Sequence, residues 1–292
     1  MKVKVETKNQ FDLAINEKEI KDIIISRDSF PEFELEKLVK IVRSKNKNPW
    51  ILMERVSRYE ELSKDNCDLR KTTDKIFDIE ELYGVIIQNL DSFSYLLRKI
   101  NKVKNEKLEV ELNYTMNCYN IETKKVYSEL YNEKRDNHKD VPLKFTAPLE
   151  LNQYELKEVG YDTLIVYSYV DTMVSANCLR KNIKESLDKD ICKYRFDFDK
   201  GFTKDLFLYD RLKKELHYKT YCKYCYNKIF NVSPLYLIDI LDEIKLDEIL
   251  DDSSYDNLRI DFSFEDSSKV KDIFNRKKPK DFTRGHIKNS IY

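Results

Sequence analysis

The feature that most constrains the fold is a regular alternation of short apolar runs and amphipathic segments over the first two-thirds of the chain. Runs rich in β-branched and aromatic residues predict strands, and apolar residues that recur three and four positions apart predict helices. We predict strands at residues 3–6, 22–26, 49–55, 85–89, 108–113, 143–147 and 163–169. We predict helices between them at residues 9–18, 34–44, 92–103, 122–133 and 153–159, the third with Asp91 as its N-cap.

This rhythm breaks after Tyr169 and resumes with an eighth strand at residues 258–264 and a helix at 267–276. Strands that alternate with helices favour a parallel sheet with helical crossovers, and eight of them fit a (β/α)8, TIM-like barrel. The alternative is an open doubly wound sheet, which usually has fewer strands and often a Gly-rich first turn. We therefore predict an α/β fold with one barrel domain over residues 1–292. Its seventh and eighth strands would be separated by a cysteine-bearing insertion at about 171–257, and a basic tail would follow at 277–292.

Composition sets the broad class of protein. Lys+Arg and Asp+Glu both number 53, which gives zero formal net charge, whereas a dedicated nucleic-acid binder normally carries a basic excess. Only 4 glycines occur, and neither the GxGxxG nor the GxxxxGK[ST] nucleotide motif is present. Residues 1–6 lack the apolar core of a signal peptide, and no stretch approaches the ~20 apolar residues of a membrane span. We expect a cytoplasmic protein without membrane association, in which thiols stay reduced.

Four of the 6 cysteines lie in the break after the seventh predicted strand: Cys178, Cys192, Cys222 and Cys225. A Cys-x-x-Cys pair brings two thiolates to one metal-sized point, and thiolates are soft ligands that suit iron–sulfur clusters or zinc. The ordinary alternative is a set of buried cysteines, since free Cys is among the most buried residue types. Their clustering favours metal binding, but the spacing does not separate iron from zinc.

If the barrel is present, functional groups should follow the carboxyl ends of its strands. The residues at these places in the sequence are Arg55, Arg58, Asn89, Asn113, Tyr114, Glu150 and Asn152. The catalytic candidates are Glu150, Asn152, Arg55, Asp210 and Arg211. Each has a structural alternative: Glu150 and Asn152 suit the entry of the helix at 153–159, with Asn152 as its N-cap, Asp210 and Arg211 suit a surface pair, and Arg55 suits an ordinary loop charge.

Tyrosines and lysines interleave around the Cys-x-x-Cys pair: Tyr218, Tyr221, Tyr224 and Tyr226 alternate with Lys219, Lys223 and Lys228. Such a pattern could stack nucleic-acid bases and hold phosphates. It could equally form an aromatic shell that keeps solvent from a metal cluster. Zero net charge favours the shell.

A set of motifs in matched order over residues 143–286 resembles the U-thirty-two (collagenase-like) peptidase family. These motifs are Ala147-Pro-Leu-Glu-Leu-Asn152, Leu164-Ile-Val-Tyr167, Met173-Val-Ser-Ala176 with Cys178, Asp210-Arg211, Cys222-x-x-Cys225-Tyr226-Asn227, Leu258-Arg-Ile-Asp-Phe262 and Phe282-Thr-Arg-Gly-His286. The resemblance implies a barrel-like fold. Several family members are similar to oxygen-independent hydroxylases, which take oxygen from prephenate and act on an RNA base or a quinone precursor. The resemblance therefore implies a [4Fe–4S] cluster held by Cys178, Cys192, Cys222 and Cys225, with zinc as the alternative.

Two other functions stay open. The family name implies collagenase-like proteolysis, but the chain has neither a His-Glu-x-x-His zinc motif nor a Gly-x-Ser-x-Gly elbow, and its 3 histidines are His138, His217 and His286. Longer members carry an additional barrel before the region matched here, which suggests a non-catalytic subunit that docks to a separately encoded family member. Ser168 stands where relatives usually have Gly, and Val170-Asp171-Thr172 stands in place of an expected Leu-Pro pair. These departures bear on activity more than on fold.

Overall fold

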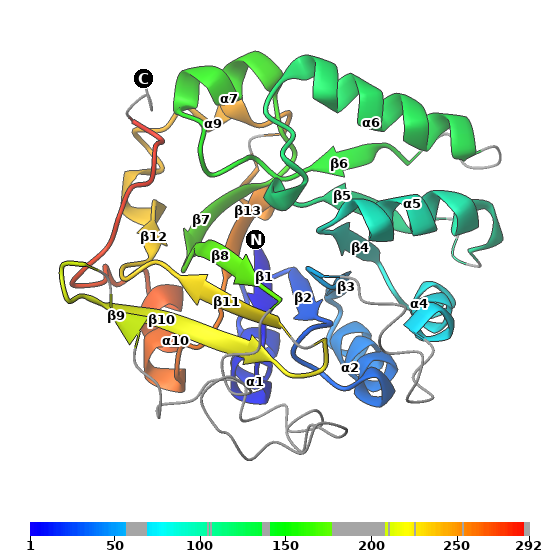
Figure 1. Cartoon of the computed structure of the whole chain (residues 1–292), viewed down its shortest axis with the longest axis horizontal. Helices are drawn as coiled ribbons and strands as arrows, with labels where there is room; N and C mark the ends of the chain where they lie inside the picture. Colours follow the sequence, from blue (N-terminus) through cyan, green and yellow to red (C-terminus); the bar gives the residue numbers. More distant parts are fainter. Residues whose placement is uncertain are drawn as a thin grey trace.

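A computed structural model of the protein describes residues 1–56, 69–103, 105, 107–135, 141–176, 208–209, 211–224, 226–252 and 254–288. Within them, the larger sheet has nine strands in the order β12-β7-β13-β1-β2-β3-β4-β5-β6 (Figure 1). Neighbouring strands are parallel, except that β12 runs antiparallel to β7. The strands are β1 (Lys2–Val5), β2 (Asp22–Ser26), β3 (Asn48–Leu52), β4 (Gly84–Ile87), β5 (Glu109–Leu112), β6 (Leu143–Phe145), β7 (Leu164–Ser168), β12 (Leu235–Tyr236) and β13 (Leu258–Asp261).

Helices connect most of these strands. They are α1 (Lys8–Asn16), α2 (Glu32–Ser44), α4 (Leu69–Phe77), α5 (Leu90–Lys99), α6 (Ile121–Lys134), α7 (Gln153–Val159), α9 (Leu246–Ile249) and α10 (Ser267–Phe274), with short 3-10 turns at Ile100–Lys102, Tyr114–Met116, Ile238–Ile240 and Tyr255–Asn257. The predicted strands and helices are confirmed, with ends that differ by a few residues. Helix α4 was not predicted. The prediction of Asp91 as an N-cap is wrong: Asn89 caps α5 by accepting the Ser92 N–H, and Asp91 lies in the first turn.

The larger sheet is strongly curled. Lys2 on β1 donates from Nζ to Glu111 Oε2 on β5 at 2.6 Å and to Thr163 Oγ1, just before β7, at 3.0 Å. Because β5 lies four strands away from β1 in the sheet order, these side chains can meet only across a concave face. An isolated parallel bridge also joins Thr146, which follows β6, to Thr163. The observed fold is thus mixed α/β with a curled, mostly parallel sheet. This confirms the predicted α/β class, whereas the closed TIM-like barrel stays a prediction.

The two faces of each strand differ in chemistry. Alternate residues of β1 point to opposite faces, so Val3 and Val5 join the main core while Lys2 and Lys4 face the concave side. One part of the concave side is apolar and contains Ile24, Trp50, Leu52 and Ile86. Gly84 is required there, since a Cβ at this position would lie 2.4 Å from Cζ3 of Trp50. Lys2, Lys4 and Glu111 make another part of the concave side charged.

A second, antiparallel sheet lies between β7 and β13 in the chain. Its order is β8-β11-β10-β9, with β8 at Asp171–Ser175, β9 at Leu208–Tyr209, β10 at Glu215–Tyr221 and β11 at Tyr226–Phe230. In Figure 1, the yellow strands β10 and β11 cross in front of β1. Side chains of β10 and β11 contact Glu6 and Asp28, which follow β1 and β2. This sheet therefore covers the carboxyl ends of the first parallel strands.

Candidate functional site

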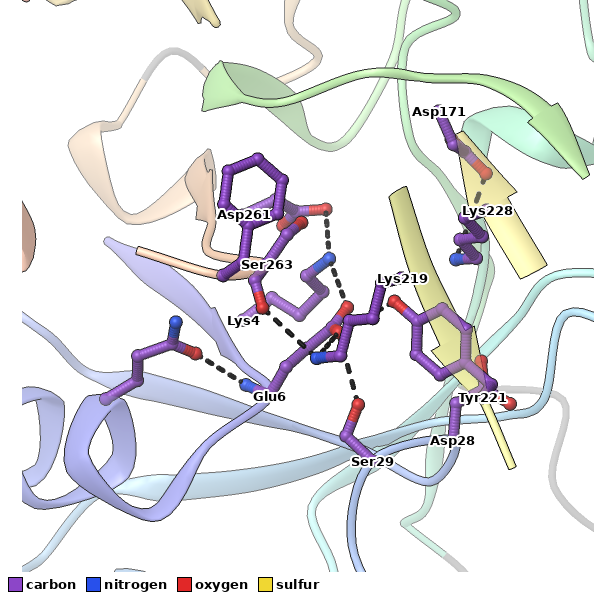
Figure 2. Close-up of polar contacts among 12 residues, drawn as sticks. Lys4, Glu6, Asp28, Ser29, Asp171, Lys219, Tyr221, Lys228, Asp261 and Ser263 are labelled. Atoms are coloured by element: carbon purple, nitrogen blue, oxygen red, sulfur yellow. Dashed lines mark hydrogen bonds and ion pairs between the residues drawn. The ribbon is translucent and has the colours of Figure 1, made fainter. Parts of the chain in front are cut away.

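A group of buried polar residues lies where the second sheet covers the ends of the parallel strands. We call it the polar cluster, and Figure 2 shows most of its members. Its members come from the ends of β1, β2 and β3 and from the covering strands: Glu6, Asp28, Glu54, Lys219, Tyr221, Tyr226 and Lys228. Each is at most 6% exposed. Buried ionisable groups at the carboxyl ends of parallel strands are a common setting for chemistry.

Glu6 is the centre of the polar cluster. Its Oε2 accepts hydrogen bonds from Lys219 Nζ at 2.6 Å, Tyr221 O–H at 2.7 Å and Ser29 Oγ at 3.1 Å, while its Oε1 accepts one from Lys4 Nζ at 2.9 Å. Burial alone would raise the pKa of Glu6, but the ammonium groups of Lys219 and Lys4 hold that pKa well below its ordinary value. Glu6 is therefore a fixed carboxylate that links the two sheets.

Asp28 has the opposite character. Its Oδ2 accepts the Tyr226 hydroxyl at 2.5 Å, but its Oδ1 has no hydrogen-bond partner among the described residues. Burial raises the pKa of Asp28 to about 6, although Lys228 and Tyr226 act against this shift. Asp28 can therefore hold or release a proton near neutral pH.

Lys228 lies opposite Lys219 in the antiparallel register of β10 and β11. Like charges directly opposite one another destabilise a strand pair unless each meets an anion. Lys219 is neutralised by Glu6 at 2.6 Å, whereas the carboxylate paired with Lys228 is Asp171, whose Oδ2 is 3.8 Å from Nζ (Figure 2). That separation is longer than a hydrogen bond, so Lys228 can still receive an anion.

Of the four predicted cysteine ligands, Cys222 alone falls in the described part of the chain, while Cys178, Cys192 and Cys225 lie outside it. Cys222 is buried and directly follows β10, one residue beyond Tyr221 of the polar cluster. In the described ranges, no group of three His, Cys, Asp or Glu side chains is arranged to hold a metal ion. The Cys222 thiol suits a soft metal, and the four-cysteine set stays a prediction.

The other candidates have different surroundings. The capping role of Asn152 is confirmed. Its Oδ1 accepts hydrogen bonds from the backbone N–H groups of Tyr154 at 2.8 Å and Glu155 at 3.1 Å, and Glu155 Oε2 accepts one from the Asn152 N–H at 2.8 Å. Glu150 is exposed just before this helix, and Arg211 is exposed in the turn before β10. Asp210 lies outside the described residues.

Arg55 lies near the polar cluster. It follows β3 and donates to the Gln88 carbonyl at 2.9 Å, while its buried Nε has no hydrogen-bond partner among the described residues. Arg58 falls outside the described residues. The sequence placed Asn113 and Tyr114 in the same region, and they do lie there: Asn113 accepts from Arg259, and Tyr114 donates to Asp171.

The tyrosines around Cys222 face inward. Tyr221, Tyr224 and Tyr226 are at most 2% exposed, and the rings of Tyr221 and Tyr226 stack with centroids 4.9 Å apart. The idea that they stack nucleic-acid bases at the surface is therefore wrong, because their faces are already covered by protein.

The basic tail is also partly neutralised. Lys278 pairs with Asp239 at 3.1 Å, Arg284 makes a two-point contact with the same carboxylate, and Lys288 pairs with Glu243. None of the helices in the described residues is long and apolar enough to cross a membrane.

Sequence reasoning missed the centre of the site, namely Glu6, Asp28 and the burial of Lys228. Glu6 is the last residue of the first predicted strand, as Arg55 is of the third, and Asp28 lies two residues after the second. The rule that pointed to Arg55 could therefore have found them. Nothing in the sequence indicates that Lys228 is buried.

Comparisons with known proteins place the chain only loosely. No known protein family matches its sequence, and no curated protein matches it. One similar solved structure is that of the U32 peptidase Mk0906, with a TM-score of 0.42 and 18% identity, covering 59% of this chain and 70% of that one. Another is an uncharacterized B. cereus protein, with a TM-score of 0.42 and 10% identity, covering 94% of this chain and 64% of that one. Neither likeness is strong enough to assign a function.

Proposed function

We propose that the protein is a U-thirty-two-type barrel enzyme, or half of one, that works at the polar cluster. The observation that carries this proposal is the gathering of Glu6 and Asp28 with Lys228 of the covering sheet at the carboxyl ends of parallel strands. A water-poor site with a fixed carboxylate, a proton-holding carboxyl and an available ammonium is costly to bury for stability alone. The protein would fold as a single domain over residues 1–292 and act in the cytoplasm.

The strand pairings support a closed barrel within this proposal. Strands β1 to β7 and β13 would be the eight strands of the barrel, and the Thr146–Thr163 bridge would close it between β6 and β7. The segment from β8 to β12 would then be the insertion that brings Cys222 to the barrel end.

We further propose that Cys178, Cys192, Cys222 and Cys225 hold a [4Fe–4S] cluster, with zinc as the alternative. The position of Cys222 beside the polar cluster supports this set. When bound, such a cluster supplies electron transfer. The chain's own residues would do the rest: Lys228 would bind an anionic group of a substrate, Asp28 would hold a proton at Oδ1, and the stacked tyrosines would exclude water.

Within this proposal we favour a small aromatic anion over RNA as the substrate, because Lys228 and Asp28 are covered and the basic tail is paired with acids. A peptidase has less support: His217 packs against the rings of Tyr169 and Phe264, and Glu150 and His286 are exposed at the surface. A separately encoded family member is the partner that this proposal expects, and its co-purification with an inactive chain would favour a non-catalytic role.

Metal analysis tests the cluster. Protein purified without oxygen should be brown and carry about 4 iron atoms per chain. Cys222→Ser should remove more than half of the iron, because a ligand is lost. Cys118→Ser is the matched control: Cys118 is also buried, but its carbonyl accepts from Tyr161 in another part of the fold, and its iron content should equal the wild type's. A colourless, iron-free wild type made with cluster assembly intact would reject iron, and stoichiometric zinc would select the alternative.

A further inference from the structure

Two described residues of the turn between β10 and β11 are buried, although the turn joins two antiparallel strands. Cys222 is 9% exposed and Tyr224 is 0% exposed. Connecting turns normally lie at the surface, because their backbone groups need water. Contacts from outside the hairpin must therefore hold this turn in place, and they come from the loop between β2 and α2.

Lys223 makes most of these contacts. Its Nζ donates to the carbonyl oxygens of Arg27 at 2.9 Å and Phe30 at 3.2 Å, and it forms an ion pair with Glu32 Oε1 at 2.9 Å. An ammonium has three N–H donors, so these three oxygens satisfy it completely. Burial lowers the pKa of Lys223, and the nearby Glu32 carboxylate acts against this shift. Lys223 thus anchors the turn by a full set of polar contacts.

Glu32 receives more than Lys223. Its Oε1 also accepts from Arg27 Nε at 2.8 Å and from the Tyr224 hydroxyl at 3.3 Å. It lies in the first turn of α2, where the helix dipole favours a carboxylate. Arg27 is in turn held by Glu54, at the end of β3, at 2.8 Å. The position of Glu32 is therefore fixed by the ends of two parallel strands.

We propose that Lys223 and Tyr224 are positioning residues, which hold Cys222 beside the polar cluster by docking its turn on Glu32 and the loop after β2. The two residues between the cysteines of the motif are then its anchors rather than spacers. This proposal rests on the proposed function in one respect: it takes metal binding as the reason why the Cys222 thiol is held in place. The anchoring itself exists without a metal.

The test measures the reactivity of Cys222 in the full chain without metal. Lys223→Met removes the three polar contacts and keeps a long side chain, and Lys245→Met is the control at a lysine whose side chain is 72% exposed. A buried thiol reacts when its surroundings open locally, so iodoacetamide should label Cys222 about tenfold faster in Lys223→Met and at the wild-type rate in Lys245→Met. Lys223→Arg, which keeps the charge, should restore slow labelling. Peptide mass spectrometry gives the rate at Cys222 alone.

Cluster absorbance after anaerobic reconstitution is the second readout. It should fall by more than half in Lys223→Met and be retained in Lys223→Arg, with unchanged far-ultraviolet circular dichroism in both. If Lys223→Met does not fold, Tyr224→Phe and Glu32→Gln replace it, and each should speed the labelling of Cys222 several-fold.

The outcomes separate this proposal from the cluster proposal. Labelling within twofold of the wild type in a folded Lys223→Met, or in both replacement variants, would overturn the anchoring. Faster labelling in a protein whose wild type binds no metal would support the anchoring and reject the proposed metal function. A wild type that binds metal, with unchanged labelling of Cys222 in the variants, would support the metal function and overturn the anchoring.

Discussion

Glu6→Ala should destabilise the protein by about 3–5 kcal/mol, because it leaves Lys219 as a buried cation without its carboxylate and leaves Lys4 with Asp261, 3.9 Å away. Lys219 Nζ and the Tyr221 hydroxyl lie 2.6 and 2.7 Å from the same oxygen of Glu6, so one substitution removes two of the hydrogen bonds between the two sheets. Chemical denaturation at pH 7 measures the loss. The matched control is Glu36→Ala, since Glu36 also pairs with a lysine but is 61% exposed, and its loss should stay below about 1 kcal/mol. Equal effects of the two variants would show that Glu6 does not link the sheets.

The contribution of Glu6 also has a defined pH dependence. Its pKa is lower in the folded protein than in the unfolded chain, so its stabilisation is fully present above the ordinary glutamate pKa and declines as the pH falls below it. The stability difference between the wild type and Glu6→Ala should therefore shrink on acidification. A difference that grew toward low pH would contradict an ionised Glu6.

Much of the fold could be predicted because buried parallel strands appear in the sequence as short, continuous apolar runs. The run Ile23-Ile24-Ile25 is apolar on both faces of β2, as expected for a strand covered on both sides. Helix α4 escaped prediction because its sequence, LRKTTDKIF, is mostly polar. The shift of the α5 cap from Asp91 to Asn89 follows from strand β4 ending earlier than predicted, at Ile87.

The candidate site could be predicted only in part, because it is made by contacts between distant segments. Lys219 and Glu6 are 213 residues apart in the chain, and each is an ordinary surface residue type when considered alone. Tyr221 and Tyr226 indicated an aromatic shell, and their burial bears out that part of the interpretation. What the shell covers from the other side, the ends of β1 and β2, depends on tertiary packing that no local pattern records.

The contrast between Glu6 and Asp28 shows how one site can carry two differently tuned carboxylates. Glu6 has two ammonium partners within 2.9 Å and stays ionised. Asp28 has a tyrosine hydroxyl on one oxygen and no hydrogen-bond partner on the other among the described residues, so burial dominates and its pKa rises to about 6. A carboxyl group that resists ionisation contributes strain rather than stability at neutral pH, which is typical of functional positions.

Asp28→Asn should therefore stabilise the protein at pH 7. The folded-state pKa of Asp28 is about 6 against an ordinary value of 3.8, so ionisation of Asp28 weakens the folded state as the pH rises through this interval. At 1.36 kcal/mol for each unit of pKa, the penalty at pH 7 is about 3 kcal/mol, and an uncharged amide avoids it while still accepting from Tyr226. The expected gain is about 1–3 kcal/mol, because the new amide N–H₂ takes the place of Oδ1, which has no hydrogen-bond partner among the described residues, and this offsets part of the benefit.

The pH profile is the decisive measurement for Asp28. The stability of Asp28→Asn relative to the wild type should be constant below pH 4, rise between pH 4 and 6, and level off above pH 6. Asp12→Asn serves as the control, since Asp12 is an exposed aspartate on α1 and its replacement should change stability by less than about 0.5 kcal/mol at every pH. A variant less stable than the wild type at pH 7, with no rise between pH 4 and 6, would show that Asp28 is ionised and well paired. In that case Lys228, rather than a bound proton, would neutralise it, and the site would lack the proton-holding group that the proposed function assigns to it.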